Sequence, residues 1–325
     1  MSTGLTKKDQ KRLMLFAGRS HPALANEVAS LLDVDLVPMR AVTYANSEIY
    51  VRFEESVRGS DAFVIQSHHA PVNEWMMEQL IMVDALKRAS AKRITVVSPF
   101  YPYARQDKKH AGREPISARL MADLYAAAGA TRIMSVDLHA AQIQGFFNGP
   151  VDHLHAMPLL SEYVARKYGQ EDLVVVSPDA GRVRMADQWT DKLGCTLAII
   201  HKRRDPNVAN TVAVHEVVGE VDGRVCLLVD DMIDTAGTIC LAADALMARG
   251  AKAVVAAATH AVLSGPAADR LNRSAFQEVI VTNTLPIDPS VNIECLTVLS
   301  IAPLIAKAIK EVFTEGSVTS LMNEG

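Results

Sequence analysis

The clearest chemical pattern lies in residues 227–240, LLVDDMIDTAGTIC, where an apolar run ends in two adjacent acids. Ligands of open α/β sheets bind beyond the carboxyl ends of the strands, and a helix N-terminus with free N–H groups binds anions. A carboxylate can accept hydrogen bonds from both hydroxyls of a cis-diol. The segment therefore predicts a ribose phosphate site, whereas a simple N-capped turn would explain only Asp234 or Thr235. The candidate residues are Asp230, Asp231, Asp234, Thr235, Ala236, Gly237 and Thr238.

Short apolar runs that alternate with helical patterns must position this segment. The predicted strands are residues 13–18, 62–67, 93–100, 132–138, 173–179, 196–202, 224–231 and 252–260. Helices are expected over 73–88 and 238–249, the second with Gly250 as its C-cap, and Ser117 is expected to cap a third. Because nearly continuous apolar strands indicate a parallel sheet covered on both faces, the fold class is α/β.

The composition excludes several classes of protein. The chain has 325 residues, about twice a typical domain, and a net charge of −4 that argues against a nucleic-acid binder. No apolar run approaches the roughly 18 residues of a membrane span, and the polar first residues do not form a signal peptide, so we expect a soluble cytoplasmic protein. The four cysteines form no CxxC pair and are interpreted as buried thiols. No GxxxxGK[ST] or GxGxxG motif is present.

Further segments resemble those of the ribose-phosphate diphosphokinases, the phosphoribosyl diphosphate synthases. The resemblance runs from about residue 13 to residue 322. The segments are YANSEIYVRF (44–53), PVNEWMMEQLIMVDALKRASA (71–91), YARQDKK (103–109), REPISARLMADL (113–124), SVDLHAAQIQGFF (135–147), VVSPDAG (175–181), HKRRDPN (201–207) and VTNTLP (281–286), together with the acidic loop.

The resemblance implies two similar α/β domains of the type I phosphoribosyltransferase kind, each with a central, mainly parallel sheet. Residues 1–156, joined by a C-terminal helix and tail over about 304–325, would form the ATP side, and 157–303 the ribose 5-phosphate side. The implied reaction is transfer of the β,γ-diphosphoryl group of MgATP to O1 of ribose 5-phosphate, releasing AMP. One predicted strand in each half of the chain ends in Val-Asp, at 136–137 and 229–230. This weak internal similarity agrees with two domains that arose by duplication.

The same resemblance implies roles for individual residues. Lys202 and Arg204 match the catalytic loop of the family, and their i, i+2 spacing on an extended segment would point both cations at one phosphate chain. His139 and Asp179 are the implied ligands of Mg²⁺, of which the carboxylate is the more natural partner. Asn46 and Glu48 are expected on one face of an extended segment. The implied ATP-binding residues are Tyr44, Asn46, Glu48, Arg105, Gln106 and His139.

Regulation and assembly also follow from the resemblance. In the family class that phosphate activates and ADP inhibits, effectors bind at residues matching Ser56, Arg58, Gln144, Asp152, Ser317, Val318 and Thr319. A neighbouring subunit completes the adenine pocket in this family, which implies at least a homodimer, and hexamers are common. Three positions depart from the family pattern: Tyr44 replaces the usual Phe, Arg182 replaces a second Gly in many members, and His110 lies at a variable position. Arg182 leaves open a more tightly specified turn or an extra anion contact.

Two other functions share parts of these motifs. A salvage phosphoribosyltransferase would have the acidic loop but would lack the YANSE and YARQDKK segments. A non-enzymatic regulator with the same fold would lose loop or metal residues, whereas Lys202, His139 and Asp179 are all in place. The synthase is therefore the favoured prediction.

Overall fold

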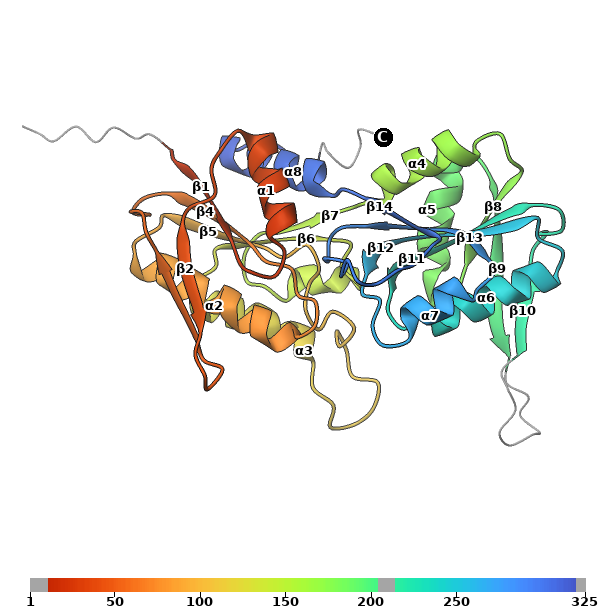
Figure 1. Ribbon diagram of the computed structural model, residues 1–325, viewed down its shortest axis with the longest axis horizontal. Helices are drawn as coiled ribbons and strands as arrows, with labels where there is room; N and C mark the ends of the chain where they lie inside the picture. The colour runs from red at the N-terminus through yellow and green to blue at the C-terminus, as the bar shows by residue number, and fades with distance from the viewer. Residues whose placement is uncertain (1–10, 204–213, 320–325) are drawn as a thin grey trace, which may run out of the picture. The chain divides into compact units, whose positions relative to one another are not determined.

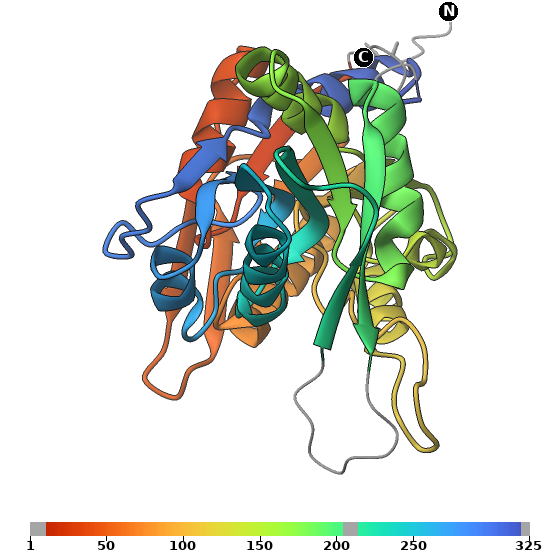
Figure 2. The ribbon, with the colours of Figure 1, turned by 90° about the vertical axis from the view of Figure 1, so that its right-hand side faces the viewer.

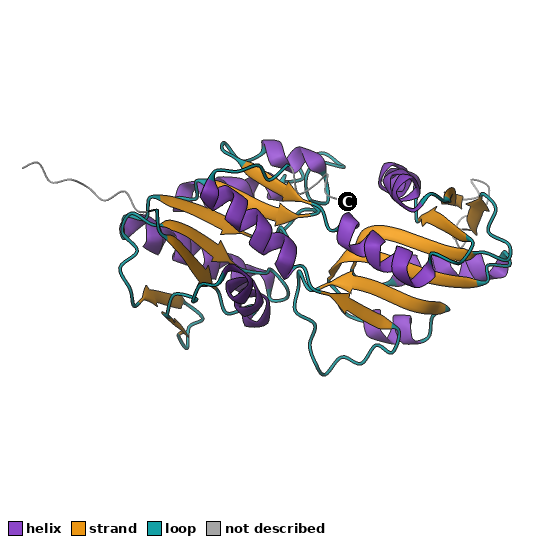
Figure 3. Ribbon diagram, turned by 90° about the horizontal axis from the view of Figure 1, so that it is seen from above, coloured by secondary structure: helices purple, strands orange, loops and turns teal. Residues whose placement is uncertain are grey.

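The computed structural model describes residues 11–203 and 214–319, without the side chains of residues 202, 203, 214 and 215. The chain divides into two units. Unit 1 runs to Leu154 and resumes at Ala302, and unit 2 is the continuous segment His155–Ile301. Each unit has its own sheet between helices, which the colouring of Figure 3 distinguishes. These two sheets confirm the predicted α/β class.

Unit 1 is built on a parallel sheet with the order β1-β4-β5-β6-β7. The strands are β1 (Leu13–Ala17), β4 (Asp61–Ile65), β5 (Arg93–Val97), β6 (Arg132–Val136) and β7 (Val151–Leu154). One face is covered by α1 (Pro22–Leu32) and α8 (Ala302–Thr314), the other by α2 (Val72–Arg88) and α3 (Ser117–Ala128) (Figure 1). Because helices cover both faces, all five residues of β4 are buried.

A separate two-stranded antiparallel sheet, formed by β2 (Met39–Thr43) and β3 (Ile49–Phe53), is also part of unit 1. The Phe53 ring packs edge-on against Phe16 of β1, with 4.7 Å between the ring centroids. We refer to β2, β3 and the turn between them as the hairpin.

Unit 2 is built on a seven-stranded sheet with the order β10-β9-β8-β11-β12-β13-β14, parallel except for the β9–β10 pair. The strands are β8 (Leu173–Ser177), β9 (Thr196–Arg203), β10 (Val214–Val218), β11 (Val225–Ile233), β12 (Ala253–Ala261), β13 (Phe276–Thr282) and β14 (Leu296–Leu299). Helices α4 (Met157–Tyr168) and α5 (Val183–Leu193) cover one face, and α6 (Gly237–Ala248) and α7 (Ala267–Asn272) the other (Figure 2). The chain order reverses between β8 and β11, which makes the carboxyl ends of these strands the switch point where ligands bind in open sheets.

All eight predicted strands are present in these two sheets, and so are the helices expected over 73–88 and 238–249. The predicted cap at Ser117 is wrong, because Ile116 occupies the cap position of α3 while the Ser117 hydroxyl donates to Gln106 Oε1. Gly250 follows the C-cap of α6 with a φ of 87°, a conformation that glycine adopts without strain.

The four cysteines are free thiols, of which Cys226 is buried and the other three are half-buried. In the part of the chain that is described, none of the helices has the length and apolar character needed to cross a bilayer.

Candidate active site

The two acids of the predicted ribose site lie near the carboxyl end of β11. We expected the acids at the tip of the strand, but the strand continues to Ile233 along β12, so they lie inside it. Strand β8 pairs with β11 only as far as Leu228, so Asp230 and Asp231 extend past that pairing on the side of the switch point. The Asp231 side chain is 3% exposed and that of Asp230 is 26% exposed.

A guanidinium joins the two acids. Arg182 Nε lies 3.0 Å from Asp230 Oδ1, and Nη2 donates to Asp231 Oδ1 at 2.6 Å. Burial and the neighbouring charge of Asp231 raise the pKa of Asp230 to about 8, and the positive charge of Arg182 acts in the opposite direction. Each carboxylate therefore disfavours the ionised form of the other, whereas the Arg182 cation favours the ionised form of both.

The loop after the acids leads into α6 without a side-chain cap. Ala236 occupies the cap position with a φ of 58°, so the N-capping alternative for Asp234 or Thr235 is excluded. The Asp234 carboxylate instead accepts from the Ser264 hydroxyl. The cap residue itself has no side-chain acceptor, so the first N–H groups of this 12-residue helix keep the polarity that attracts an anion.

Arg270 of α7 borders the same loop. Its Nη1 donates to the carbonyl of Thr235 at 2.8 Å, and a Cβ built on Gly237 would lie 3.1 Å from that nitrogen. Glycine at the start of α6 therefore leaves room for a cation beside the helix N-terminus. Arg270 was not predicted from the sequence, because it lies 35 positions away from its acceptor.

Asp179 follows β8 and opens the short 3₁₀ helix Ala180–Arg182. Its Oδ1 accepts from the backbone N–H groups of Gly181 at 2.7 Å and Arg182 at 3.1 Å. The side chain is exposed. These bonds hold the carboxylate at the carboxyl end of β8, beside the strand that carries the two acids.

In unit 1, Tyr44, Asn46 and Glu48 lie in the turn of the hairpin. Tyr44 N donates to Glu48 O at 2.8 Å, Ser47 N donates to Tyr44 O at 2.8 Å, and Ser47 has a φ of 72°. The expected extended segment is therefore wrong: the chain reverses here, and Asn46 Oδ1 accepts from Glu48 N at 3.2 Å. The three residues still come together, and the Tyr44 ring is 51% exposed.

A buried ion pair anchors the end of β2 in the hairpin. Arg19 Nη2 donates to Thr43 Oγ1 at 2.9 Å, while its Nε donates to Glu78 Oε2 of α2 at 2.5 Å. Glu78 is fully buried and also accepts from Arg19 N and from Gln66 Nε2, at 2.7 and 2.9 Å. This connection between α2 and the hairpin was not predicted.

Two further ATP candidates, Arg105 and Gln106, are exposed residues of the loop between β5 and α3, and the Gln106 carbonyl accepts from Ala118 N at 3.1 Å. His139 is half-buried in the loop after β6. In the same loop, a carboxylate oxygen of Asp137 lies within 4.8 Å of a ring nitrogen of His153, a proximity that the sequence did not indicate.

The two catalytic candidates are less fully described. Lys202 lies in β9, close to its end, and only its backbone is described. Arg204 lies outside the described residues.

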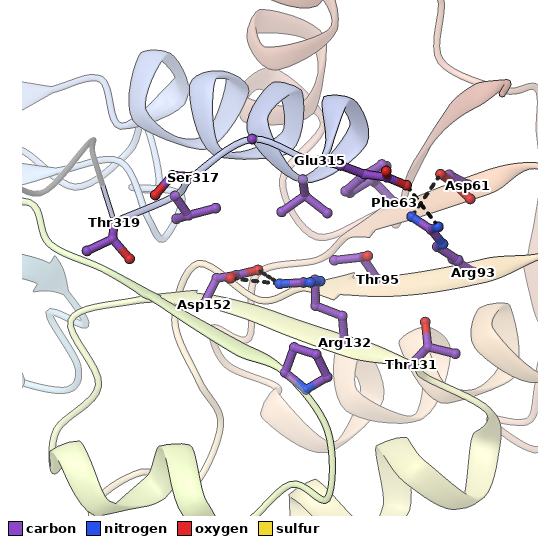
Figure 4. A pocket seen from close by; sticks show the side chains of 14 residues that line it. Asp61, Phe63, Arg93, Thr95, Thr131, Arg132, Asp152, Glu315, Ser317 and Thr319 are labelled. Carbon is purple, nitrogen blue, oxygen red and sulfur yellow. Dashed lines mark hydrogen bonds and ion pairs between the residues drawn. The ribbon is translucent and has the colours of Figure 1, made fainter.

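The expected regulatory residues separate into two groups. Asp152, Ser317, Val318 and Thr319 line a cavity of about 660 Å³ at the amino ends of the unit 1 strands (Figure 4). Ser56, Arg58 and Gln144 are exposed and are not among the residues that line it.

Two arginines in the cavity are paired with acids. Arg132 Nη1 donates to both carboxylate oxygens of Asp152 at 2.8 Å, and Arg93 Nη2 donates to Glu315 Oε1 at 3.1 Å. Hydrogen bonds from Lys11 and Arg93 lower the pKa of Glu315.

Known proteins match this chain over nearly its whole length. Residues 13–129 match the N-terminal domain of ribose phosphate pyrophosphokinase, and residues 207–323 match the phosphoribosyl synthetase-associated domain. The ribose-phosphate pyrophosphokinase of Streptomyces coelicolor is 65% identical over 322 residues, which are 99% of each chain. The chain belongs to the ribose-phosphate pyrophosphokinase family. Another family member, from Mycobacterium tuberculosis, is 62% identical over 316 residues, 97% of each chain.

A solved structure agrees with this family membership. The phosphoribosylpyrophosphate synthetase of Mycobacterium smegmatis superposes with a TM-score of 0.90 and 61% identity, covering 94% of this chain and 100% of that one. The predicted ribose-phosphate pyrophosphokinase family, its fold and its enzyme class are thus confirmed, and the salvage transferase and the non-enzymatic regulator are not supported.

Proposed function

We propose that the chain transfers the β,γ-diphosphoryl group of MgATP to O1 of ribose 5-phosphate, giving 5-phosphoribosyl 1-diphosphate and AMP for nucleotide biosynthesis. In this proposal the two units are its domains, with ATP bound by residues of unit 1 and ribose 5-phosphate by residues of unit 2. The observation that carries it is the pair of acids beside an uncapped helix N-terminus at the switch point of the unit 2 sheet.

The ribose 5-phosphate site follows from the chemistry of this loop. Asp230 and Asp231 accept hydrogen bonds from the 2- and 3-hydroxyls. The 5-phosphate lies at the N-terminus of α6, where Thr235 and Thr238 are exposed and can donate their hydroxyls. Asp234, Ala236 and Gly237 shape the loop, and Arg270 supplies positive charge at its border.

ATP binding rests on the hairpin turn and the adjoining loops. The exposed Tyr44 ring offers a face for adenine, and Asn46 and Glu48 offer polar groups for its edge. Arg105, Gln106 and His139 contact the remainder of the nucleotide.

Magnesium is the proposed metal, with Asp179 and His139 as ligands. An exposed carboxylate fits an ion that prefers oxygen and keeps several of its waters, and the bonds from Gly181 and Arg182 fix the orientation of Asp179. Bound Mg²⁺ would neutralise charge on the triphosphate. Oxygen donors of ATP itself would complete the preferred ligand set beside the less usual imidazole.

Lys202 and Arg204 are the proposed catalytic residues, since diphosphoryl transfer depends on neutralising the migrating charge. Lys202→Ala should lower turnover by ~10²–10⁴-fold, the range for loss of an electrostatic transition-state contact. The Michaelis constants should change far less. A variant that keeps more than half of wild-type turnover would contradict this role.

The cavity of unit 1 is the proposed effector site for phosphate and ADP. It offers two guanidinium groups and the hydroxyls of Ser317 and Thr319. Arg132→Ala should therefore weaken activation by phosphate and inhibition by ADP together. Unchanged responses to both effectors would remove the cavity from the proposal.

Assembly into a homo-oligomer, at least a dimer and in our proposal a hexamer, would complete the adenine pocket with a neighbouring subunit. Sedimentation equilibrium of the purified chain tests this, and a monomer at assay concentration would contradict it. We also propose a cytoplasmic location, where free thiols persist.

The decisive experiment incubates the purified chain with ribose 5-phosphate and MgATP and measures every nucleotide and sugar product. Equal amounts of AMP and phosphoribosyl diphosphate are expected. ADP as the nucleotide product would indicate γ-phosphoryl transfer and refute the proposal. Asp231→Ala should reduce the preference for ribose 5-phosphate over 2-deoxyribose 5-phosphate. An unchanged preference would contradict the proposal that Asp231 binds the ribose hydroxyls.

A further inference from the structure

Arg182 ends the short 3₁₀ helix after β8 and lies beside the two acids of β11. Its backbone N–H is held by Asp179, and α5 begins at the next residue, so the chain direction is fixed on both sides. Its guanidinium is 19% exposed and lies within hydrogen-bonding distance of one oxygen of each acid, Asp230 Oδ1 and Asp231 Oδ1. The contact joins positions 49 residues apart, at the ends of two adjacent strands.

The two acids need such a cation. Neighbouring carboxylates removed from water disfavour each other's charge, and burial already raises the pKa of Asp230. A carboxyl that takes up a proton accepts hydrogen bonds more weakly than a carboxylate does. A counterion at the pair therefore strengthens their ability to accept from hydroxyl groups.

The ion pair includes one oxygen of each acid, Oδ1. A carboxylate has two oxygens and about four lone-pair sites. The contacts with Arg182 use Oδ1 of each acid, and Asp231 N also donates to Asp230 Oδ1, at 2.8 Å. A guanidinium fork that contacts two carboxylates through different nitrogens fixes them relative to each other, which a single ammonium cannot do.

We propose that Arg182 is a specificity-determining residue of the ribose site, where its fork holds Asp230 and Asp231 as a fixed pair of hydrogen-bond acceptors for the sugar diol. This inference rests on the proposed function. Arg182 acts as a positioning residue, through the acids, and not by contact with the reacting atoms.

The test compares Arg182→Gln, which removes the charge, with Arg182→Lys, which keeps the charge but loses the fork. We measure kcat and KM for ribose 5-phosphate, 2-deoxyribose 5-phosphate and ATP. Arg182→Gln should raise KM for ribose 5-phosphate by ~10–100-fold, the effect of losing a charge-assisted hydrogen bond, and should reduce the ribose-to-deoxyribose preference. KM for ATP should stay within about twofold, because the acids do not contact ATP. Arg182→Lys should lie between wild type and Arg182→Gln.

The matched control is Arg184→Gln, the same exchange at an exposed position of α5 two residues away. It should leave all these constants unchanged. If Arg182→Gln does not fold, Arg182→Lys and its sugar preference still decide the question.

An unchanged sugar preference in both variants overturns the inference. A lower KM for ribose 5-phosphate also overturns it, because the arginine would then compete with the sugar. Failure of the proposed function is recognised separately, since the wild-type chain would then form no AMP from ribose 5-phosphate.

Discussion

Replacing Glu78 by glutamine tests whether the buried ion pair holds unit 1 together. The carboxylate is fully buried and accepts three hydrogen bonds, two from Arg19 and one from Gln66. Glutamine keeps the size of the side chain but turns one acceptor oxygen into a donor NH₂ that faces other donors. The exchange also leaves the guanidinium of Arg19 without its counterion.

The expected cost follows from the burial of each partner. Removing one partner of a buried ion pair costs about 3–5 kcal/mol. Because the Arg19 side chain is 32% exposed and keeps part of its hydration, we expect the lower end, about 3 kcal/mol. For a unit of this size, each kcal/mol lowers Tm by about 2–4 °C, so the melting temperature of unit 1 should fall by roughly 6–12 °C.

Circular dichroism during thermal and urea unfolding measures this effect. The matched control is Asp84→Asn on the same helix, whose ion pair with Arg88 is exposed to solvent and should contribute much less to stability. KM for ATP should rise in Glu78→Gln as well, since Arg19 also holds Thr43 beside the hairpin turn. Equal stability of the two variants would refute the reasoning.

Three further predictions concern single groups. Thr238→Val should raise KM for ribose 5-phosphate by about 3–10-fold without changing the preference over the 2-deoxy sugar, because one phosphate contact is lost; a changed preference in the product assay would contradict this. Burial lowers the pKa of His68 to about 4, so the unfolded state binds the extra proton as the pH falls below 6.5. Urea unfolding should therefore show about 2 kcal/mol less stability at pH 5 than at pH 7 from this residue, a difference that is absent in His68→Gln. Tyr168→Phe removes the 2.5 Å hydrogen bond to Glu278 Oε2 and should lower the free energy of unfolding by about 1.5–3 kcal/mol, measured by thermal unfolding. Tyr163→Phe, at a half-buried position, should lower it less.

The sequence predicted those parts of the fold that depend on local pattern. Strands β4 and β8, buried along their whole length, each contain an unbroken apolar run of four residues, 62–65 and 173–176. The hairpin strands were not predicted, because they pair only with each other and alternate between half-buried and exposed residues without a strong apolar run. Local rules failed at Ser117 for a related reason, since its hydroxyl has a partner 11 positions away.

The candidate site, too, was predictable from the sequence only where it depends on consecutive residues. The order of residues from Asp230 to Thr238 was sufficient to predict an acidic strand end followed by a helix start, because strand, loop and helix are consecutive. The contacts of Arg182, Arg270 and Arg19 were not predictable from spacing, since each joins elements that only the folded sheet brings together. Family resemblance supplied the proposed catalytic role of Lys202, for which spacing alone indicates no more than a basic segment.

The discontinuity of unit 1 has a consequence for the order in which the chain is made. Helix α8 packs against α1, and Glu315 just beyond it pairs with Lys11 and Arg93, so unit 1 is completed by residues that are made after unit 2. At about 5–20 residues per second, a ribosome needs roughly 7–30 s to proceed from Leu154 to Ala302. During that interval the nascent unit 1 lacks α8, which packs against α1 and whose Ile305 and Ile309 are fully buried in the finished protein. The continuous unit 2 is complete before α8 emerges, so premature termination near the end of translation would damage the amino-terminal unit and spare the one made after it.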